Sequence, residues 1–291
     1  MKGLNISQVA RPTKVEEAVS LLDQWGPSAR LVAGNTTIYE LARQGGLVDV
    51  DKLIDVSNLG LSYVEAKDGI LYAGSATTFI QLAKSELLLA PSVFTLRETA
   101  AKITPPQVRN MGTLGGAISS GIPFYDMPTT ILALGSRIKA VSAKGEREIP
   151  ADDFFVDYFV TALDSSELVV EVQTPLQLNT GTAFVKIGRT SVDFAVVNCS
   201  AKVRLNERGD RIEQARIALG AVATKPIRTL SVEKALVGSD VSRDKIAVAA
   251  KSAAEEIDPS PSIHASPGYK KKIIPVVIRD AVLTAAERAR S

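Results

Sequence analysis

Cysteine and histidine are nearly missing from this sequence, since Cys199 and His264 each occur once among 291 residues. One cysteine cannot form an intramolecular disulfide, and it cannot hold an iron–sulfur cluster that needs several thiolates. One histidine leaves no histidine-rich metal site and removes most Ser-His and Cys-His catalytic groups. We therefore expect no metal site and no catalytic side chain in this chain. His264 lies in a turn-rich loop, DPSPSIHASPG, and is expected to be exposed to solvent.

Long apolar runs and an excess of one charge are also missing. No stretch approaches the roughly 18 apolar residues of a membrane span, and the start, MKGLNISQVARPTK, lacks the apolar core of a signal peptide. The 34 basic and 32 acidic residues are mixed and leave a net charge of +2, so nothing favours nucleic acid or a lipid surface. With no disulfide framework, the cytoplasm is expected. The one dense basic cluster, Lys270 to Lys272, is expected to be a solvated face rather than a binding patch.

Small residues crowd together between Gln107 and Asp126, where the sequence is QVRNMGTLGGAISSGIPFYD. Such a run lets the backbone take positive φ and approach another molecule closely, while hydroxyls and free amides can hold oxygen anions. This pattern favours a diphosphate cradle. A glycine-rich turn that only joins two elements is the alternative.

A second candidate cradle is Gly34-Asn35-Thr36-Thr37, which follows a short apolar strand and precedes a helix. A flexible turn, two hydroxyls and the free amides of a helix start together suit an anion. The segment lacks the lysine of a Walker loop and the spacing of G-x-G-x-x-G, so neither of those nucleotide folds is supported. An ordinary capping turn, with Thr36 or Thr37 as the cap, is the alternative.

Apolar periodicity indicates an α+β protein in two parts that meet near Pro175, and the length of the chain also favours two domains. Thr13 and Thr78 are expected to cap helices. Before Pro175 the expected strands are 5–10, 29–33, 53–56, 69–74, 137–142 and 167–175, and the expected helices are 14–25, 38–46, 80–89, 92–103 and 127–134. After it, an antiparallel meander of 183–187, 195–205 and 211–219 precedes helices 231–236, 243–256 and 270–290, which are expected on one face of the sheet.

The two cradles, the strand ELVVEVQTP and the segment AFVKIGRTSVDFAVVNCSAKV together resemble the flavoprotein subunit of molybdenum hydroxylases, the xanthine dehydrogenase and carbon monoxide dehydrogenase family. The resemblance spans nearly the whole chain. It implies a two-part FAD-binding fold of the vanillyl-alcohol-oxidase (PCMH) type over residues 1–175, split near 55–60. An α+β C-terminal domain of the carbon monoxide dehydrogenase flavoprotein type would occupy residues 176–291.

The same resemblance implies an FAD site made of two loops and three further positions. The expected residues are Val32, Ala33, Gly34, Asn35, Thr36, Thr37 and Ile38 in the first loop, Val108, Gly112, Thr113, Gly115, Gly116, Ser120 and Asp126 in the second, and Ile103, Val169 and Lys186 elsewhere. The family's pattern implies that amides of the first loop grip the diphosphate. Gly34 and Gly116 should then lie within one cofactor's length of each other.

The same resemblance implies roles for individual residues. Thr113 and Ser120 would donate hydrogen bonds, Asp126 would accept from ribose hydroxyls, and Lys186 would lie near the pyrimidine edge of the flavin. A surface lysine on a strand is the alternative for Lys186. Val169 would contact the flavin ring or the adenine.

Three features leave alternatives open. Thr37 stands where many members carry an acidic residue, and Ala117 stands where many carry asparagine, so one side-chain hydrogen bond to the cofactor is expected to be missing or replaced by water. Four aromatic side chains are expected to form a core cluster, with stacking on a flavin or a substrate as the alternative: Phe154, Phe155, Tyr158 and Phe159.

The family works as an oxidoreductase complex of three components, and this chain resembles its middle piece. Electrons would come from a large molybdopterin-binding subunit through a small subunit with [2Fe–2S] clusters, reach FAD here, and leave to an external acceptor. A dimer of heterotrimers is the implied assembly. Two other functions stay open at this point: a stand-alone flavin oxidase of the related fold, and a scaffold subunit without flavin.

Overall fold

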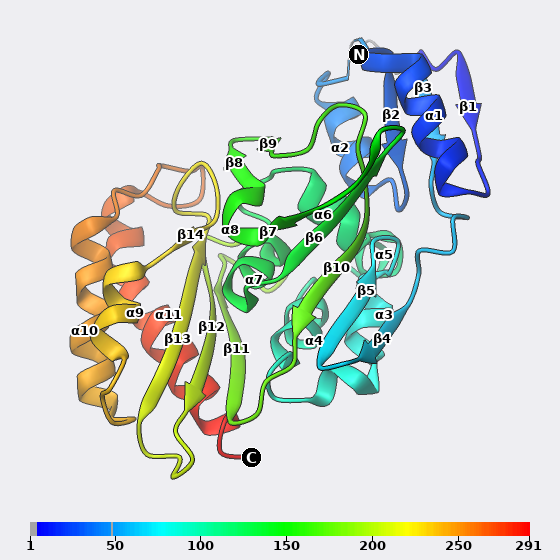
Figure 1. The fold of residues 1–291 in the computed structure, drawn as a ribbon. Coiled ribbons are helices and arrows are strands. Elements are labelled where there is room, and N and C mark those ends of the chain that lie inside the picture. Colours follow the sequence, from blue (N-terminus) through cyan, green and yellow to red (C-terminus); the bar gives the residue numbers. More distant parts are fainter. Residues whose placement is uncertain (1–4, 48) are drawn as a thin grey trace.

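The computed structural model describes residues 5–47 and 49–291, and its chain runs through three regions in order (Figure 1). The first region holds a parallel three-stranded sheet in the order β1-β3-β2. Its elements are β1 (Gln8–Ala10), α1 (Val15–Trp25), η1 (Gly26–Ser28), β2 (Ala29–Val32), α2 (Thr36–Arg43) and β3 (Lys52–Asp55). Ala18, Val19 and Leu22 recur at helical spacing on α1 and share one apolar cluster with Ile54 of β3.

The second region is an antiparallel five-stranded sheet in the order β4-β5-β10-β6-β7, covered by short helices. Its strands are β4 (Val64–Lys67), β5 (Ile70–Gly74), β6 (Arg137–Ser142), β7 (Gly145–Pro150) and β10 (Leu168–Pro175), with a small pair β8 (Phe155–Asp157) and β9 (Val160–Thr161). Its helices are α3 (Phe79–Lys84), η2 (Glu86–Leu89), α4 (Phe94–Ala101), α5 (Pro106–Met111), α6 (Leu114–Ser119), α7 (Asp126–Leu134) and α8 (Ala151–Phe154). Except for α5, which has no buried residue, these helices join the strands in one buried apolar cluster.

The third region is an antiparallel meander in the order β11-β12-β13-β14, followed by three helices. It comprises β11 (Thr180–Ile187), β12 (Val197–Leu205), β13 (Ile212–Gly220), β14 (Ile227–Arg228), α9 (Leu230–Leu236), α10 (Arg243–Glu256) and α11 (Pro267–Arg288). Helix α11 packs on β11 and β12, while α4 and α7 of the second region contact β11 and β12 as well. Nearly every residue of β12 is buried, as in a sheet covered on both faces.

The predicted α+β class and the antiparallel sheet with packed helices are confirmed. Of the two predicted threonine caps, one is wrong and one is confirmed. Lys14, not Thr13, is the N-cap residue of α1, and the amide of Thr13 donates to the Glu17 carboxylate at 3.2 Å. The predicted cap at Thr78 is confirmed, because its hydroxyl and Gln81 form a reciprocal capping box for α3.

The glycine-rich stretch is more than a single turn, because it contains the short helices α5 and α6. Pro106 is the first residue of α5, where a missing amide proton costs nothing. The helix α6 carries its glycines because Leu114 and Ile118 anchor it in the core. The chain then turns through Gly121 at a φ of 61°.

Three expectations about side-chain exposure are corrected. Phe154 and Phe155 are buried, but Tyr158 and Phe159 are about half-exposed, so the predicted aromatic core cluster is only half present. Lys270 of the basic cluster is 3% exposed, and its ammonium donates to the carbonyls of Ala221 and Ser260. His264 is half-buried rather than exposed.

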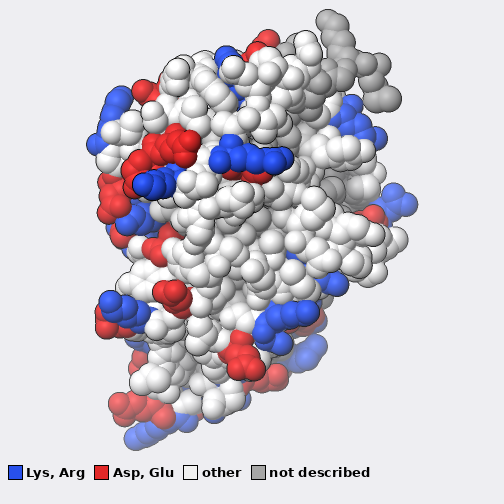
Figure 2. Space-filling model, turned by 90° about the vertical axis from the view of Figure 1, so that its right-hand side faces the viewer, with Lys and Arg blue, Asp and Glu red and all other residues white. Residues whose placement is uncertain are grey.

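The surface charges are mixed in sign, as the balanced composition predicts (Figure 2). On the face shown in Figure 2, Lys, Arg, Asp and Glu lie beside one another toward the margins, and the centre is largely uncharged. In the part of the chain that the structure describes, no helix is both long and apolar enough to cross a bilayer. Within the same ranges, no three His, Cys, Asp or Glu residues gather as a metal site would require.

Candidate functional site

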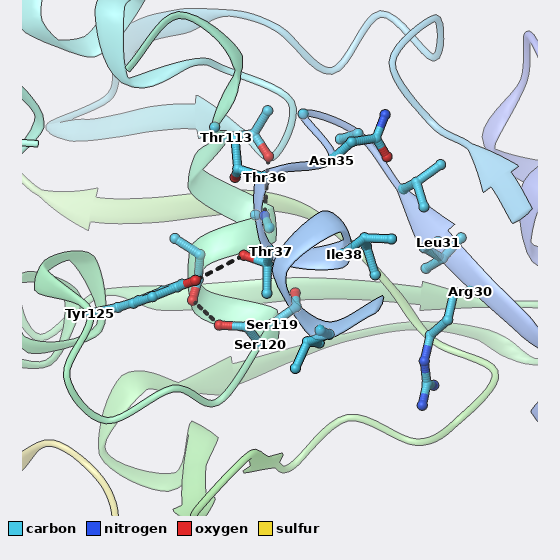
Figure 3. A pocket seen from close by; sticks show the side chains of 18 of the residues that line it. Arg30, Leu31, Asn35, Thr36, Thr37, Ile38, Thr113, Ser119, Ser120 and Tyr125 are labelled. Atoms are coloured by element: carbon cyan, nitrogen blue, oxygen red, sulfur yellow. Dashed lines mark hydrogen bonds between the residues drawn. The ribbon is translucent and has the colours of Figure 1, made fainter. Parts of the chain in front are cut away.

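A cavity of about 1110 Å³ lies where the three regions meet. It is lined by the first region around β2 and α2, by α6 and its flanking loops, by the start of β10, and by the end of β11. Figure 3 shows side chains from α2 and from the glycine-rich stretch directed into one space. All seventeen residues expected to hold the cofactor line this cavity: Val32, Ala33, Gly34, Asn35, Thr36, Thr37, Ile38, Ile103, Val108, Gly112, Thr113, Gly115, Gly116, Ser120, Asp126, Val169 and Lys186.

The two glycine loops touch each other, and both line the one cavity. A Cβ on Gly34 would lie 1.7 Å from the carbonyl oxygen of Met111 and 3.1 Å from the Cα of Gly112. No side chain fits in that space, because real Cβ atoms do not come closer than about 3 Å to backbone. The first loop therefore packs directly on the residues that lead into α6.

The first loop offers unused backbone donors. Asn35 takes the left-handed conformation, with φ 59° and ψ 0°, and thereby turns the chain from β2 into α2. Thr36, Thr37 and Ile38 form the first turn of α2, and among the described residues no acceptor faces their amides. Neither threonine caps the helix, so the capping-turn alternative is wrong. Free amides at a helix start suit an oxygen anion.

The second loop is already hydrogen-bonded within the protein. Leu114 and Gly115 donate to the carbonyls of Thr77 and Ser75, and the amide of Gly116 donates to the Thr113 hydroxyl oxygen at 3.2 Å. The loop therefore offers close approach rather than free amides. Gly116 is exposed, and a Cβ there would meet only the Thr113 oxygen, at 3.0 Å.

A hydrogen bond between side chains joins the two loops. The hydroxyls of Thr37 and Tyr125 lie 3.1 Å apart, and Figure 3 shows them facing each other across the site. Burial raises the pKa of Tyr125, so its hydroxyl stays protonated at neutral pH. The hydroxyl of Ser120 donates to the carbonyl of Ala117 at 2.8 Å, so an acceptor within the protein already takes its proton.

Lys186 and Asp126 form an ion pair with Nζ and Oδ2 2.8 Å apart. Their side chains are 12% and 6% exposed, so Lys186 is not the surface lysine that was the alternative. The second oxygen of Asp126 accepts from the amide of Asn198 at 2.8 Å. Burial raises the pKa of Asp126, while attraction to Lys186 opposes that rise. Both carboxylate oxygens are thus engaged within the protein, which does not favour the expected ribose role.

Aromatic side chains near this ion pair were missed in the sequence. Tyr125 and Phe194 stack with centroids 5.7 Å apart, and Phe124 meets Phe194 edge-on at 5.0 Å. Phe194 is 51% exposed, and it lines the cavity together with Tyr125 and Phe159. Single aromatics in loops carry no periodic signal, so only their spatial neighbours mark them as part of the site.

The lining of the cavity combines apolar and polar surfaces. Leu31 of β2 and Leu168 of β10 belong to the apolar cluster of the first region. The free amides at the start of α2, the bare Gly116 and the charged pair of Asp126 and Lys186 line the same cavity. A long molecule with a diphosphate in its middle, such as FAD, fits this combination of surfaces.

Comparison with known proteins agrees with this geometry. Residues 5–177 match the family described as the FAD binding domain in molybdopterin dehydrogenase, and residues 182–285 match the CO dehydrogenase flavoprotein C-terminal domain. The chain is 32% identical to the 6-hydroxypseudooxynicotine dehydrogenase complex subunit alpha of Paenarthrobacter nicotinovorans, over 95% of this chain and 93% of that protein.

Two further relatives are similar over almost their whole length. The xanthine dehydrogenase FAD-binding subunit of Escherichia coli O157:H7 is 27% identical, over 96% of each chain. A solved structure of carbon monoxide dehydrogenase from Hydrogenophaga pseudoflava superposes with a TM-score of 0.93 at 29% identity, over 99% of each chain. The chain therefore belongs to the family of FAD-binding medium subunits of molybdenum hydroxylases, of the carbon monoxide dehydrogenase and xanthine dehydrogenase flavoprotein type.

Proposed function

We propose that this chain is the electron-transfer subunit of a three-component molybdenum hydroxylase. Its partners are a large molybdopterin-binding subunit and a small [2Fe–2S] subunit, arranged as a dimer of heterotrimers in the cytoplasm. Electrons pass from the [2Fe–2S] clusters to FAD in this chain and then to an external acceptor. The observation that carries the proposal is one cavity lined by residues from four separate segments, in a family that binds FAD.

The proposal assigns each part of the cavity to a part of FAD. The amides of Thr36, Thr37 and Ile38 hold the diphosphate, and Gly116 leaves room for it. Val169 and its apolar neighbours in the lining take the adenosine, and the surface beside Lys186 takes the flavin ring.

Bound FAD supplies reversible transfer of one or two electrons, which no side chain of this protein can perform. The protein's part is to bind, orient and tune. The loops anchor the diphosphate, and the ammonium of Lys186 places positive charge where the reduced ring carries negative charge. We also propose that residues 1–175 form the FAD-binding domain, split near 55–60, and that residues 176–291 form the C-terminal domain.

Replacing Gly116 by leucine tests the site. The added Cβ would meet only the Thr113 oxygen within the protein, so we expect the fold to persist while the leucine fills the diphosphate space. We expect the purified full chain to bind FAD with the yellow flavin absorbance and G116L to lose at least 90% of it. The control is Gly268→Leu, at a glycine with no atom within 4 Å of an added Cβ.

The result that contradicts the proposal is full flavin content in a folded G116L protein. Reduction of the bound FAD by a small alcohol, without partner subunits, would instead support a stand-alone oxidase. Copurification with a molybdenum-bearing large chain and a cysteine-rich small chain supports the three-component complex.

A further inference from the structure

The ion pair between Lys186 of β11 and Asp126 of α7 is unusually buried. Its side chains are 12% and 6% exposed, and both residues line the cavity. The next most buried ion pair in residues 5–47 and 49–291 joins Arg228 to Glu233, with side chains 22% and 8% exposed. Burying two charges costs several kcal/mol unless their geometry is good, so a buried pair is weak support for stability alone.

A chain of hydrogen bonds holds the carboxylate of Asp126 from behind. Its Oδ1 accepts from the amide of Asn198 at 2.8 Å, and the oxygen of that amide accepts from the Thr129 hydroxyl at 2.8 Å. Asn198 and Thr129 are fully buried. Gly220 packs so closely that a Cβ there would lie 2.2 Å from the Thr129 oxygen and 2.3 Å from the Asn198 oxygen. These contacts hold the Asp126 carboxylate in one position.

The lysine end of the pair is less occupied. An ammonium carries three N–H donors, and the described residues offer Lys186 a single acceptor, Asp126. The remaining donors are available to whatever occupies the cavity. A negative charge therefore lies directly beside the ammonium of Lys186, which is the one lysine of residues 5–47 and 49–291 that lines the cavity. The buried surroundings screen these charges less than water does.

Resting on the function proposed above, we propose that Asp126 sets the reduction potential of bound FAD through Lys186, with Asn198 fixing the carboxylate in place. A cation beside the pyrimidine edge favours the reduced ring, and the adjacent carboxylate offsets part of that effect. Asp126 is then a positioning residue that weakens the effect of the Lys186 charge on the flavin ring. This role does not require Asp126 to contact the ribose.

The test compares the full chain with D126N, K186M and the double variant, each loaded with FAD. The bound FAD is titrated in equilibrium with a redox dye of known potential; dithionite supplies two electrons per FAD and water supplies the protons. At a fixed dye potential, D126N should raise the ratio of reduced to oxidised FAD at least tenfold, equivalent to about 30 mV for a two-electron couple. K186M should lower that ratio. The double variant should match K186M, because Asp126 acts through the lysine.

Several outcomes overturn the inference. A D126N ratio within a factor of three of wild type shows that the carboxylate does not moderate the lysine. A D126N effect that persists in the K186M background shows that Asp126 acts on FAD directly. Asp126→Ser provides a second neutral variant, and loss of FAD by both neutral variants would make Asp126 a binding residue instead. Asp152→Asn, outside the cavity, should leave the ratio unchanged.

The two proposals fail differently. If the wild-type chain folds and takes up no FAD, the proposed function is wrong. If it binds FAD and the variants leave the ratio unchanged, only the role of Asp126 is wrong.

Discussion

Gly34 lies where the first loop crosses the residues before α6, and the contact is too close for any side chain. An added Cβ would overlap the Met111 carbonyl at 1.7 Å, so the two loops must separate to accept it. We expect Gly34→Ala to lower the free energy of unfolding by about 1–3 kcal/mol. It should also weaken FAD binding at least tenfold, because both loops bound the same cavity. Urea unfolding and a flavin-binding titration measure the two effects.

Gly268→Ala is the matched control for this change. The glycine is the second residue of α11, and no atom lies within 4 Å of an added Cβ. Alanine favours the helix, so stability should stay level or rise by up to about 1 kcal/mol. Equal effects of the two substitutions would show that the Gly34 contact is unimportant.

Lys202 is a buried cation with no carboxylate partner among the described residues. It is 8% exposed, and its ammonium donates to the Leu134 carbonyl at 3.1 Å. Burial, with repulsion from Arg216 and Arg204, lowers its pKa to about 8. Below pH 8 the folded protein carries the full cost of this charge. Between pH 8 and the unfolded pKa near 10.4, the unfolded chain binds more protons than the folded one, so stability rises with pH.

Lys202→Met should therefore be more stable than wild type at pH 7, by roughly 1–3 kcal/mol after the lost hydrogen bond is counted. The difference should shrink as the pH rises from 8 toward 10, because the wild-type lysine then loses its proton. Urea unfolding at pH 7, 9 and 10 follows this trend. The exposed Lys245→Met control should show no such trend, and a constant K202M difference would contradict the assignment.

At the scale of single elements, α3 shows how a cap supports the site. The Thr78 hydroxyl accepts from the Gln81 amide, and the Gln81 side chain accepts from the Thr78 amide at 2.8 Å. The next amide, that of Phe79, donates to the Gly112 carbonyl at 3.0 Å, so the start of α3 holds the start of the second loop. Thr78→Ala should lower stability by about 1 kcal/mol.

Thr13→Ala is the control for the cap. Thr13 precedes α1 in a similar sequence context, but its exposed side chain makes no cap hydrogen bond in the structure. Its replacement should change stability by less than about 0.5 kcal/mol. Thermal unfolding of both variants measures this difference in stability. Equal destabilisation by the two substitutions would indicate that Thr13 also caps a helix.

The elements that were predicted well have strong apolar periodicity. Helix α10 and strand β6 have the bounds that the sequence predicts, Arg243–Glu256 and Arg137–Ser142. The strands β4 and β7 were missed because they are edge strands with polar, exposed residues, so burial leaves little pattern in them. The helix α6 was missed because its glycines lower local helix propensity, which core packing of Leu114 and Ile118 outweighs. The helix α5 was missed because it has no buried residue, so burial leaves no apolar pattern in it.

At the scale of the molecule, a partly buried carboxylate joins the second and third regions. Glu98 of α4 accepts from the amide of Phe184 at 2.8 Å and from Arg288 of α11 at 2.9 Å. Arg288 also lies over the ring of Phe94, 4.4 Å from its centroid. Burial raises the pKa of Glu98, but hydrogen bonding from Arg288 and attraction to Lys102 outweigh it and hold that pKa below its usual value.

Glu98→Ala should lower the free energy of unfolding by about 2–4 kcal/mol, because an amide and a guanidinium lose their partner together. The loss should also separate the unfolding of residues 1–175 from that of 176–291, visible as a broader urea transition. Glu146→Ala removes an exposed partner of Lys139 and should cost less than about 0.5 kcal/mol. If E98A unfolds in a sharp transition and loses as little free energy of unfolding as E146A, then Glu98 does not join the two regions.

The sequence by itself predicted the two glycine loops and the α+β class, and its resemblance to the family added Val169 and Lys186 to the positions that line the cavity. Glycine, a threonine cap and apolar periodicity act on the backbone over a few residues, and such local effects are visible in one dimension. Only the tertiary structure decided that Asp126 pairs with Lys186, sixty residues away, and that Thr37 meets Tyr125. Those contacts arise because packing the three regions removes water from groups far apart in the chain, and each buried charge or hydroxyl then takes the partner that the fold places beside it.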